Sequence, residues 1–197
     1  MKSKDIQIEN SGNNSGVLVA DNNGVIQISM KETIKIPSLI SKVVQSLGVA
    51  CLDADISGAL YSLEEYKPDE KITYNNVIRY KYIIKEYVTY YMYCDNFLNI
   101  YDDSNVRGKA KILRCIHLWY LEAKGQIFSE NQDSGKDEMD LIRLYSDRII
   151  DMVKDRIYDT VKNSDEFGSA CAEDLELGIA CFTCYCFMEC KILEKPK

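Results

Sequence analysis

A long stretch near the middle of the chain carries apolar or aromatic side chains at every third or fourth position. The pattern comprises Val77, Tyr80, Ile84, Tyr87, Tyr91, Cys94, Leu98 and Tyr101. Such spacing places the side chains on one face of an α-helix. Asn75 and Asn76 precede the pattern as N-cap residues, and polar turn residues follow it at 102–105. The pattern therefore predicts one helix of about 26 residues, about 39 Å long, against which the rest of the chain packs.

Three later segments show the same helical spacing, at 108–127, 141–161 and 172–193. The last of them is apolar on nearly every side at its centre, so we expect it to be the most deeply buried helix. Short connections between long helices favour antiparallel neighbours. Pro68 disfavours helix at the residue before it, which marks a boundary. We therefore predict a mainly α fold, an antiparallel helical bundle over residues 67–197 that follows connecting helices in residues 31–66.

Residues 1–30 follow a different pattern, in which short β-branched runs alternate with turns rich in Asn and Gly. The runs NNSGVLVA and NNGVIQI form an imperfect repeat, and Asn-Gly between apolar β-branched residues is a hairpin signal. We therefore predict a small β-hairpin or meander appendage. No Lys follows any of these glycines and no helical pattern opens behind them, so they fit turns better than a phosphate-binding loop.

This predicted appendage buries too little apolar surface to be stable alone. The edges of its strands are also open to pairing with another strand. We therefore expect the segment to pack on the helical body or to pair with the same segment of another copy, which makes 1–30 an oligomerisation segment. Its candidate partner-binding residues are Val17, Val19, Val25, Ile26 and Ile28.

The chain has 197 residues, a net charge of −7 and a sequence pI of about 4.9. An acidic field argues against non-specific binding to nucleic acid or to an anionic membrane, since both need a basic surface. No apolar run reaches the roughly 18 residues that a membrane-spanning helix requires. The first residues, MKSKDIQIENSG, lack the apolar segment of a secretory signal. We therefore expect a cytoplasmic protein with reduced thiols.

The spacing of four cysteines, Cys181, Cys184, Cys186 and Cys190, raises the hypothesis of a metal site. Zinc sites usually take paired cysteines from loops, which lets four sulfurs converge on the ion. Here the cysteines lie in a helical pattern and no single helix face carries all four, so we interpret them as core side chains. The single histidine, His117, excludes sites with several histidines. We predict no metal, no cofactor and no catalytic residue.

Tyrosine is abundant, with 14 residues in the chain and seven between positions 74 and 93. One hypothesis is an amphipathic helix face whose phenols reach polar partners. The other is a surface that contacts another protein, since tyrosine is enriched at interfaces. Seven tyrosines cannot all line one narrow core stripe, so some are exposed or contact a partner. Among them we predict Tyr82, Tyr90 and Tyr93 as partner-binding residues.

Three runs of the sequence resemble one known family. They are KITYNNVIRYKYIIKEYVTYYMYCDNFLNIYDD from Lys71, GKAKILRCIHLWYLEAKG from Gly108 and EDLELGIACFTCYCFMECKILEKP from Glu173. They resemble the C-terminal helical domain of the bacterial ABC-three-component anti-phage defence systems. The N-terminal segment resembles short β-repeat modules found ahead of effector domains in bacterial conflict proteins. The matching residues serve packing and capping, so the resemblance implies a non-enzymatic component that works with an ATPase and other subunits.

From these patterns and this resemblance we expect a non-enzymatic adaptor or scaffold of a bacterial anti-phage defence complex. It would act through oligomerisation and partner binding, and its partners would be copies of itself and other subunits, with an ATPase among the candidates. The alternative hypothesis is a small-molecule or nucleotide sensor whose pocket lies between the long helices. That pocket would be lined by Tyr87, Tyr91, Trp119 and Tyr120. A third hypothesis is a cysteine-based metal-binding protein.

Overall fold

The computed structural model describes residues 35, 37–53, 68–104, 107–165 and 171–196, which belong, apart from residue 35, to one compact unit, 36–197. The α-helices are α1 (Leu39–Asp53), α2 (Pro68–Tyr74), α3 (Lys81–Tyr87), α4 (Tyr91–Ser104), α5 (Gly108–Glu130), α6 (Glu138–Leu144), α7 (Ser146–Lys162) and α8 (Ala172–Met188). Two 3₁₀ turns, η1 (Val88–Tyr90) and η2 (Gln132–Ser134), complete the set. The predicted mainly helical class is confirmed, and the described part of the chain contains no strand. The β-hairpin or meander expected in 1–30 lies outside the described residues.

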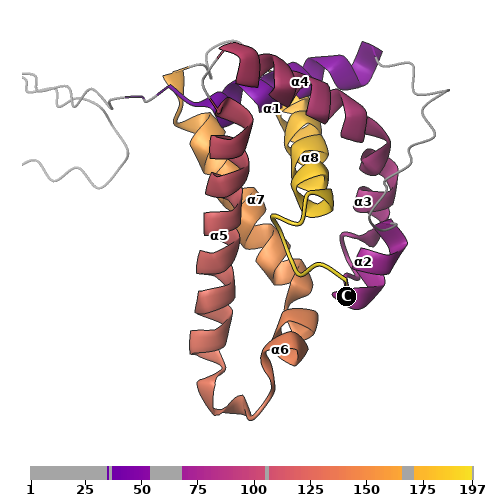
Figure 1. The fold of residues 1–197 in the computed structure, drawn as a ribbon, viewed down its shortest axis with the longest axis vertical. Coiled ribbons are helices and arrows are strands. Elements are labelled where there is room, and N and C mark those ends of the chain that lie inside the picture. The colour runs from indigo at the N-terminus through magenta and orange to yellow at the C-terminus, as the bar shows by residue number, and fades with distance from the viewer. Residues whose placement is uncertain (1–34, 36, 54–67, 105–106, 166–170, 197) are drawn as a thin grey trace, which may run out of the picture. The chain divides into compact units, whose positions relative to one another are not determined.

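Helix α8 is the centre of the helical unit (Figure 1), and α1, α3, α4 and α7 pack against it. From residue 181 onward all eight of its remaining side chains are buried. A helix that is apolar on every side loses least when neighbours cover all of it. The prediction that this helix is the most deeply buried is therefore confirmed. Helix α1, which lies in the segment expected to be connecting, contributes the fully buried Val43, Val44 and Leu47 to the same core.

Two glycines let α1 and α8 approach until their backbones touch. A β-carbon on Gly178 would lie 1.9 Å from the carbonyl oxygen of Val44, and one on Gly48 would lie 2.0 Å from that of Asp174. Any side chain at either position would collide with main-chain atoms that have no room to move. The two glycines therefore fix how closely these helices pack.

The single long helix predicted from 77 to 101 is wrong, because the chain bends twice within it. Asn76 has a φ of 52°, and the next backbone N–H groups bond to the carboxylate of Asp147 in α7, with Arg79 N donating to Oδ2 at 2.9 Å. This carboxylate holds the backbone of residues 78–80 immediately ahead of α3. The second break is η1, where the β-branched Val88 and Thr89 fall in a 3₁₀ turn. A residue far along the chain thus decides where α3 begins.

The other predicted helices differ in their ends. Helix α5 matches the expected 108–127 segment and extends to Glu130. The segment expected as one helix over 141–161 is two, because Tyr145 separates α6 from α7. The last helix stops at Met188 instead of residue 193, and the positive φ angles of Cys190 and Leu193 turn the chain after it. Side chains from α2 and α5 hold this turned segment, as described next.

Candidate functional site

A buried lysine holds the C-terminal end of α8. The Lys71 side chain, from α2, is fully buried, and its Nζ donates to the carbonyl oxygens of Phe187 and, at 2.9 Å, Ile192. Nζ also lies 4.3 Å from the centre of the Phe187 ring. Burial lowers the pKa of Lys71 to about 8, because it removes water from the charged form. The amine therefore joins α2 to the last turn of α8 and to the segment that follows it, so its role is to fasten the chain.

Three further side chains, those of Asn75, Tyr120 and Lys124, hold the segment that follows α8. Asn75 donates from Nδ2 to the Glu194 carbonyl at 2.8 Å and accepts at Oδ1 from the Glu194 backbone N–H at 3.0 Å. The carboxylate of Glu194 accepts from Tyr120 at 2.6 Å and from Lys124 at 3.0 Å. Partial burial alone would raise the pKa of Glu194, but these two donors outweigh it and lower the pKa. Every polar group in this cluster is used to join α2 and α5 to the chain end.

A second polar cluster joins α4, α5 and α8 around Asp95. Its Oδ1 accepts from Lys109 and from the Tyr185 hydroxyl, each at 2.7 Å. Partial burial favours the neutral acid, but the Lys109 and Tyr185 hydrogen bonds outweigh it and hold the pKa of Asp95 below its ordinary value. Burial and this hydrogen bond raise the pKa of Tyr185, so its hydroxyl keeps the proton that it donates. This cluster too is an internal support.

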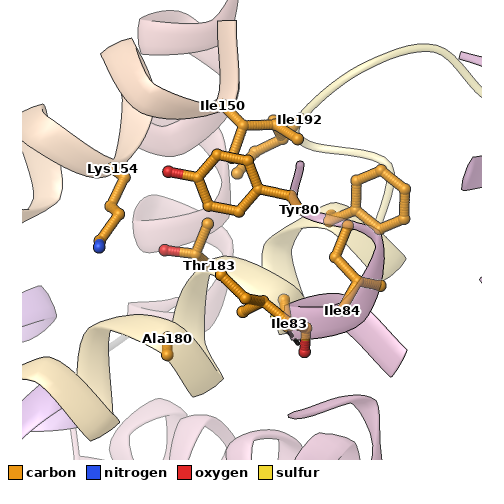
Figure 2. Close-up of a pocket in the computed structure, with 10 residues that line it drawn as sticks. Tyr80, Ile83, Ile84, Ile150, Lys154, Ala180, Thr183 and Ile192 are labelled. Carbon is orange, nitrogen blue, oxygen red and sulfur yellow. Dashed lines mark hydrogen bonds between the residues drawn. The ribbon is translucent and has the colours of Figure 1, made fainter. Parts of the chain in front are cut away.

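A small cavity lies between α3, α7 and α8 (Figure 2), with a volume of about 40 Å³. Its lining residues are Tyr80, Ile83, Ile84, Ile150, Lys154, Ala180, Thr183, Cys184, Phe187 and Ile192. Most of these side chains are apolar, and their sequence positions show that three separate helices and the chain end form the walls. Figure 2 shows the hydroxyls of Tyr80 and Thr183 on the side of the cavity where Lys154 lies. The cavity therefore has one polar side and one apolar side.

The polar side of the cavity contains an unused hydrogen-bonding group. Thr183 is only 5% exposed, and its buried Oγ1 has no hydrogen-bond partner among the residues that the structure describes. The Tyr80 hydroxyl, in contrast, donates to Asp151 at 2.6 Å. Lys154 Nζ lies 3.7 Å from the exposed carboxylate of Glu176, which is a long ion pair. A buried hydroxyl without a partner costs about 1–3 kcal/mol, so an occupant that bonds to Thr183 would be stabilised.

A different surface, on α5, shows apolar side chains to solvent. Leu118 is 53% exposed and Leu121 is 48% exposed. At 100° per residue, Lys111, Arg114 and Gly125 lie with these leucines within about 80° of the helix circumference. We call these five residues the α5 outer face. A β-carbon on Gly125 would have no atom of the described residues within 4 Å, so no contact in the described part of the chain requires glycine there.

The α5 outer face is electrically asymmetric along the helix. Lys111 and Arg114 lie toward its N-terminal end, and neither side chain forms an ion pair or hydrogen bond within the described residues. Toward the C-terminal end, Glu122 pairs with Arg156 at 3.1 Å and Glu130 pairs with Arg148 at 2.6 Å. Both carboxylates remain partly exposed. The N-terminal end of the face is therefore cationic, and two carboxylates, each paired with an arginine of α7, lie beside its C-terminal end.

Of the predicted partner-binding tyrosines, the structure leaves one largely open. Tyr82 in α3 is 77% exposed. Tyr90 in η1 and Tyr93 in α4 are half-buried against the core, with ring centres 6.5 Å apart. The five predicted residues of the N-terminal strands, Val17, Val19, Val25, Ile26 and Ile28, lie outside the described part of the chain.

The four aromatic residues predicted to line one pocket occupy separate places. Tyr91 packs on Tyr185, with ring centres 5.0 Å apart, while Tyr120 bonds to Glu194. Trp119 lies in a surface hollow between α5 and α7, beside Arg156. None of the four lines the cavity around Thr183. The sequence pattern missed this cavity, because Thr183 lies among apolar residues that read as uniform core.

The cysteines are placed as packing residues. Cys181, Cys184 and Cys186 are buried in the core, and Cys190 follows the end of α8. Burial raises the pKa of Cys184 to about 12, which keeps the thiol protonated. Within the described ranges, no group of three or more His, Cys, Asp or Glu side chains is placed to hold a metal ion.

Comparisons of the chain with protein-family models, with curated proteins and with solved structures find no match. The resemblance to the helical domain of anti-phage defence systems therefore stays an expectation from the sequence. No helix in the described residues combines the length and the apolar character that crossing a membrane requires.

Proposed function

We propose that this protein is a non-enzymatic adaptor or scaffold that joins copies of itself and other protein subunits. The observation that carries the proposal is the α5 outer face, which exposes two leucines and a helical glycine with no neighbour. Glycine in a helix interior costs about 1 kcal/mol relative to alanine, so an unexplained one suggests a close approach from outside. The polar clusters around Lys71, Asp95 and Glu194 are already engaged in joining the helices.

The occupant that fits the α5 outer face best is the same face of a second copy, running antiparallel. A two-fold axis between Leu118 and Leu121 brings each leucine against the other leucine of the second copy. Arg114 then lies over Gly125 of that copy, with Glu122 of that copy within reach. The cationic end of one face then lies near Glu122 of the other copy, whereas a parallel pairing would place Lys111 and Arg114 of the two copies together.

The free energy expected from burying these leucines indicates that the contact between α5 outer faces is one part of a larger interface. Burying the exposed half of a leucine contributes about 1 kcal/mol, and the pair of faces has four such leucines. A total of about 4 kcal/mol corresponds to a dissociation constant near 1 mM before any cost of association. Additional contacts are required, and the N-terminal segment 1–30 with its expected open strand edges would supply them.

A second surface suits a different subunit. Tyr82 and Ile78 are both largely exposed on or next to α3, and they line a surface hollow together with Lys81. An exposed tyrosine beside an exposed apolar side chain is typical of the centre of protein interfaces. We propose this surface for the other subunits of a cytoplasmic bacterial anti-phage defence complex, an ATPase being the candidate that the family resemblance supplies.

Light scattering coupled to size-exclusion chromatography of the full-length protein tests the proposal. We expect the average mass to rise with concentration across the micromolar range. The double substitution Leu118→Arg and Leu121→Arg should lower that mass toward the monomer, because it places like charges face to face. Leu144→Arg is the matched control, since Leu144 is exposed to a similar degree on α6.

Two results would contradict the proposal. One is a monomer at every concentration. The other is an equal loss of association in the Leu144→Arg control, which would show that added charge acts without regard to position. Far-ultraviolet circular dichroism of all variants checks that the helices are retained.

A further inference from the structure

The cavity between α3, α7 and α8 has the features of a ligand site, not those of a packing defect. Packing defects are lined by apolar atoms, which leave no hydrogen bond unmade. This one places the unpartnered hydroxyl of Thr183, 95% of whose surface is buried, against an apolar wall formed by residues such as Ile84 and Phe187. A water can bond to Thr183 on the polar side, but it would leave the apolar wall of the cavity without packing contacts.

The size of the cavity limits what enters it. A volume of about 40 Å³ holds about three water-sized groups, at 10–15 Å³ for each. A nucleotide is far too large, and so is an aromatic ring, since a dry cavity that takes benzene has about 150 Å³. An aliphatic tail of about three carbons fits the apolar part, with a polar head remaining at the side of Lys154.

The polar side selects the head group. Thr183 and Lys154 both have hydrogens to donate, and the Lys154 ammonium is only loosely paired with Glu176. The nearby Asp151 would repel an anion, but Arg79 forms an ion pair with it and the Tyr80 hydroxyl also donates to it. Two donors, one of which is a loosely paired cation, favour a carboxylate over an alcohol or an amine.

We infer that this cavity binds a short-chain aliphatic carboxylate of about four or five carbons, such as butyrate or isovalerate. The tail lies against Ile83, Ile84 and Phe187. One carboxylate oxygen accepts a hydrogen bond from the Thr183 hydroxyl, and the other accepts from Lys154 Nζ. The site does not involve α5, so it stands or falls independently of the association proposed above.

Thermal unfolding and calorimetry of the full-length protein with a series of sodium carboxylates test the inference, at ionic strength matched with sodium chloride. The melting temperature should rise from acetate to butyrate or isovalerate and should fall back for octanoate, whose tail exceeds the cavity. Butanol and butylamine at the same concentration should have little effect. No shift with any acid overturns the inference, and so does an equal shift with butanol or butylamine.

Substitutions locate the site. Thr183→Val keeps the side-chain shape and should weaken butyrate binding about tenfold, the value of one hydrogen bond to a charged group. Lys154→Met should weaken it to a similar extent. Thr160→Val and Lys162→Met on α7 are the matched controls, because these residues do not line the cavity. Unchanged affinity in both cavity variants would show that the acid binds elsewhere.

A cavity-filling change gives an independent check. Ala180→Leu places three more carbons on a lining residue that is itself half-exposed. We expect this variant to fold with an unchanged or higher melting temperature and to lose the response to butyrate. Ala172→Leu at the exposed start of α8 should keep the response. A butyrate response that survives Ala180→Leu overturns the inference.

Discussion

The crossing of α1 and α8 and the outer face of α5 use the same residue, glycine, in opposite surroundings. At the crossing, added β-carbons on Gly48 and Gly178 would lie within 2.0 Å of carbonyl oxygens. On α5, a β-carbon at Gly125 would touch nothing. Contacts inside the molecule explain Gly48 and Gly178. Gly125 lowers the stability of α5, and no contact among the described residues compensates for that loss. A helical glycine that its own molecule does not require therefore indicates a contact with another molecule.

The largest expected effect is a loss of stability on substitution of a glycine at the crossing of α1 and α8. Gly178→Ala should lower the free energy of unfolding by more than about 3 kcal/mol, because its β-carbon would overlap the backbone of Val44 and the two helices must separate. Urea unfolding followed by circular dichroism measures this change. A loss below about 1 kcal/mol would show that α1 and α8 are not in backbone contact.

The next largest effect concerns the end of α8, where Lys71 acts. The folded pKa of about 8 lies below the ordinary 10.5, so between these values the unfolded chain binds more protons and stability rises with pH. Relative to Lys71→Met, the natural protein should therefore gain about 1 kcal/mol between pH 7 and pH 9. Urea unfolding of both proteins at these pH values gives the difference. A difference that stays flat or falls would mean that Lys71 is not held in a dry site.

The smallest effect is at Gly125, and it has the opposite sign. Gly125→Ala should raise the stability of the dilute monomer by about 0.5–1 kcal/mol, because the site is open and helical. The change is measured at low concentration, where association does not contribute. A destabilisation of the same size as that of Gly178→Ala would mean that α5 has an internal neighbour at this position.

Sequence patterns predicted the elements whose ends depend on local residues. Helix α5 and the buried core of α8 follow directly from their apolar spacing. The helix predicted over 77–101 begins later than expected because Asp147, about 70 residues further along, accepts hydrogen bonds from the backbone N–H groups of residues 78–80, ahead of α3. No local pattern contains such a contact.

The candidate sites were less predictable for a similar reason. Thr183 looks like one polar residue within an apolar helix, and only the placement of α3 and α7 shows that its hydroxyl has no partner. The α5 outer face had a sequence signal, since Leu118 and Leu121 fall outside the apolar register of that helix. The partner-binding tyrosines were predicted from the abundance of tyrosine. Of Tyr82, Tyr90 and Tyr93 only Tyr82 is largely exposed.

Antiparallel pairing of two α5 outer faces is tested most directly by photo-crosslinking of the full-length protein. A photoreactive residue replaces Lys111 in an isotope-labelled chain, which is mixed with unlabelled chain so that mass spectrometry identifies links between copies. The account predicts that position 111 links to the C-terminal part of α5, around Phe128, in the other copy. Links to the N-terminal part of α5, or no links between copies, would contradict it.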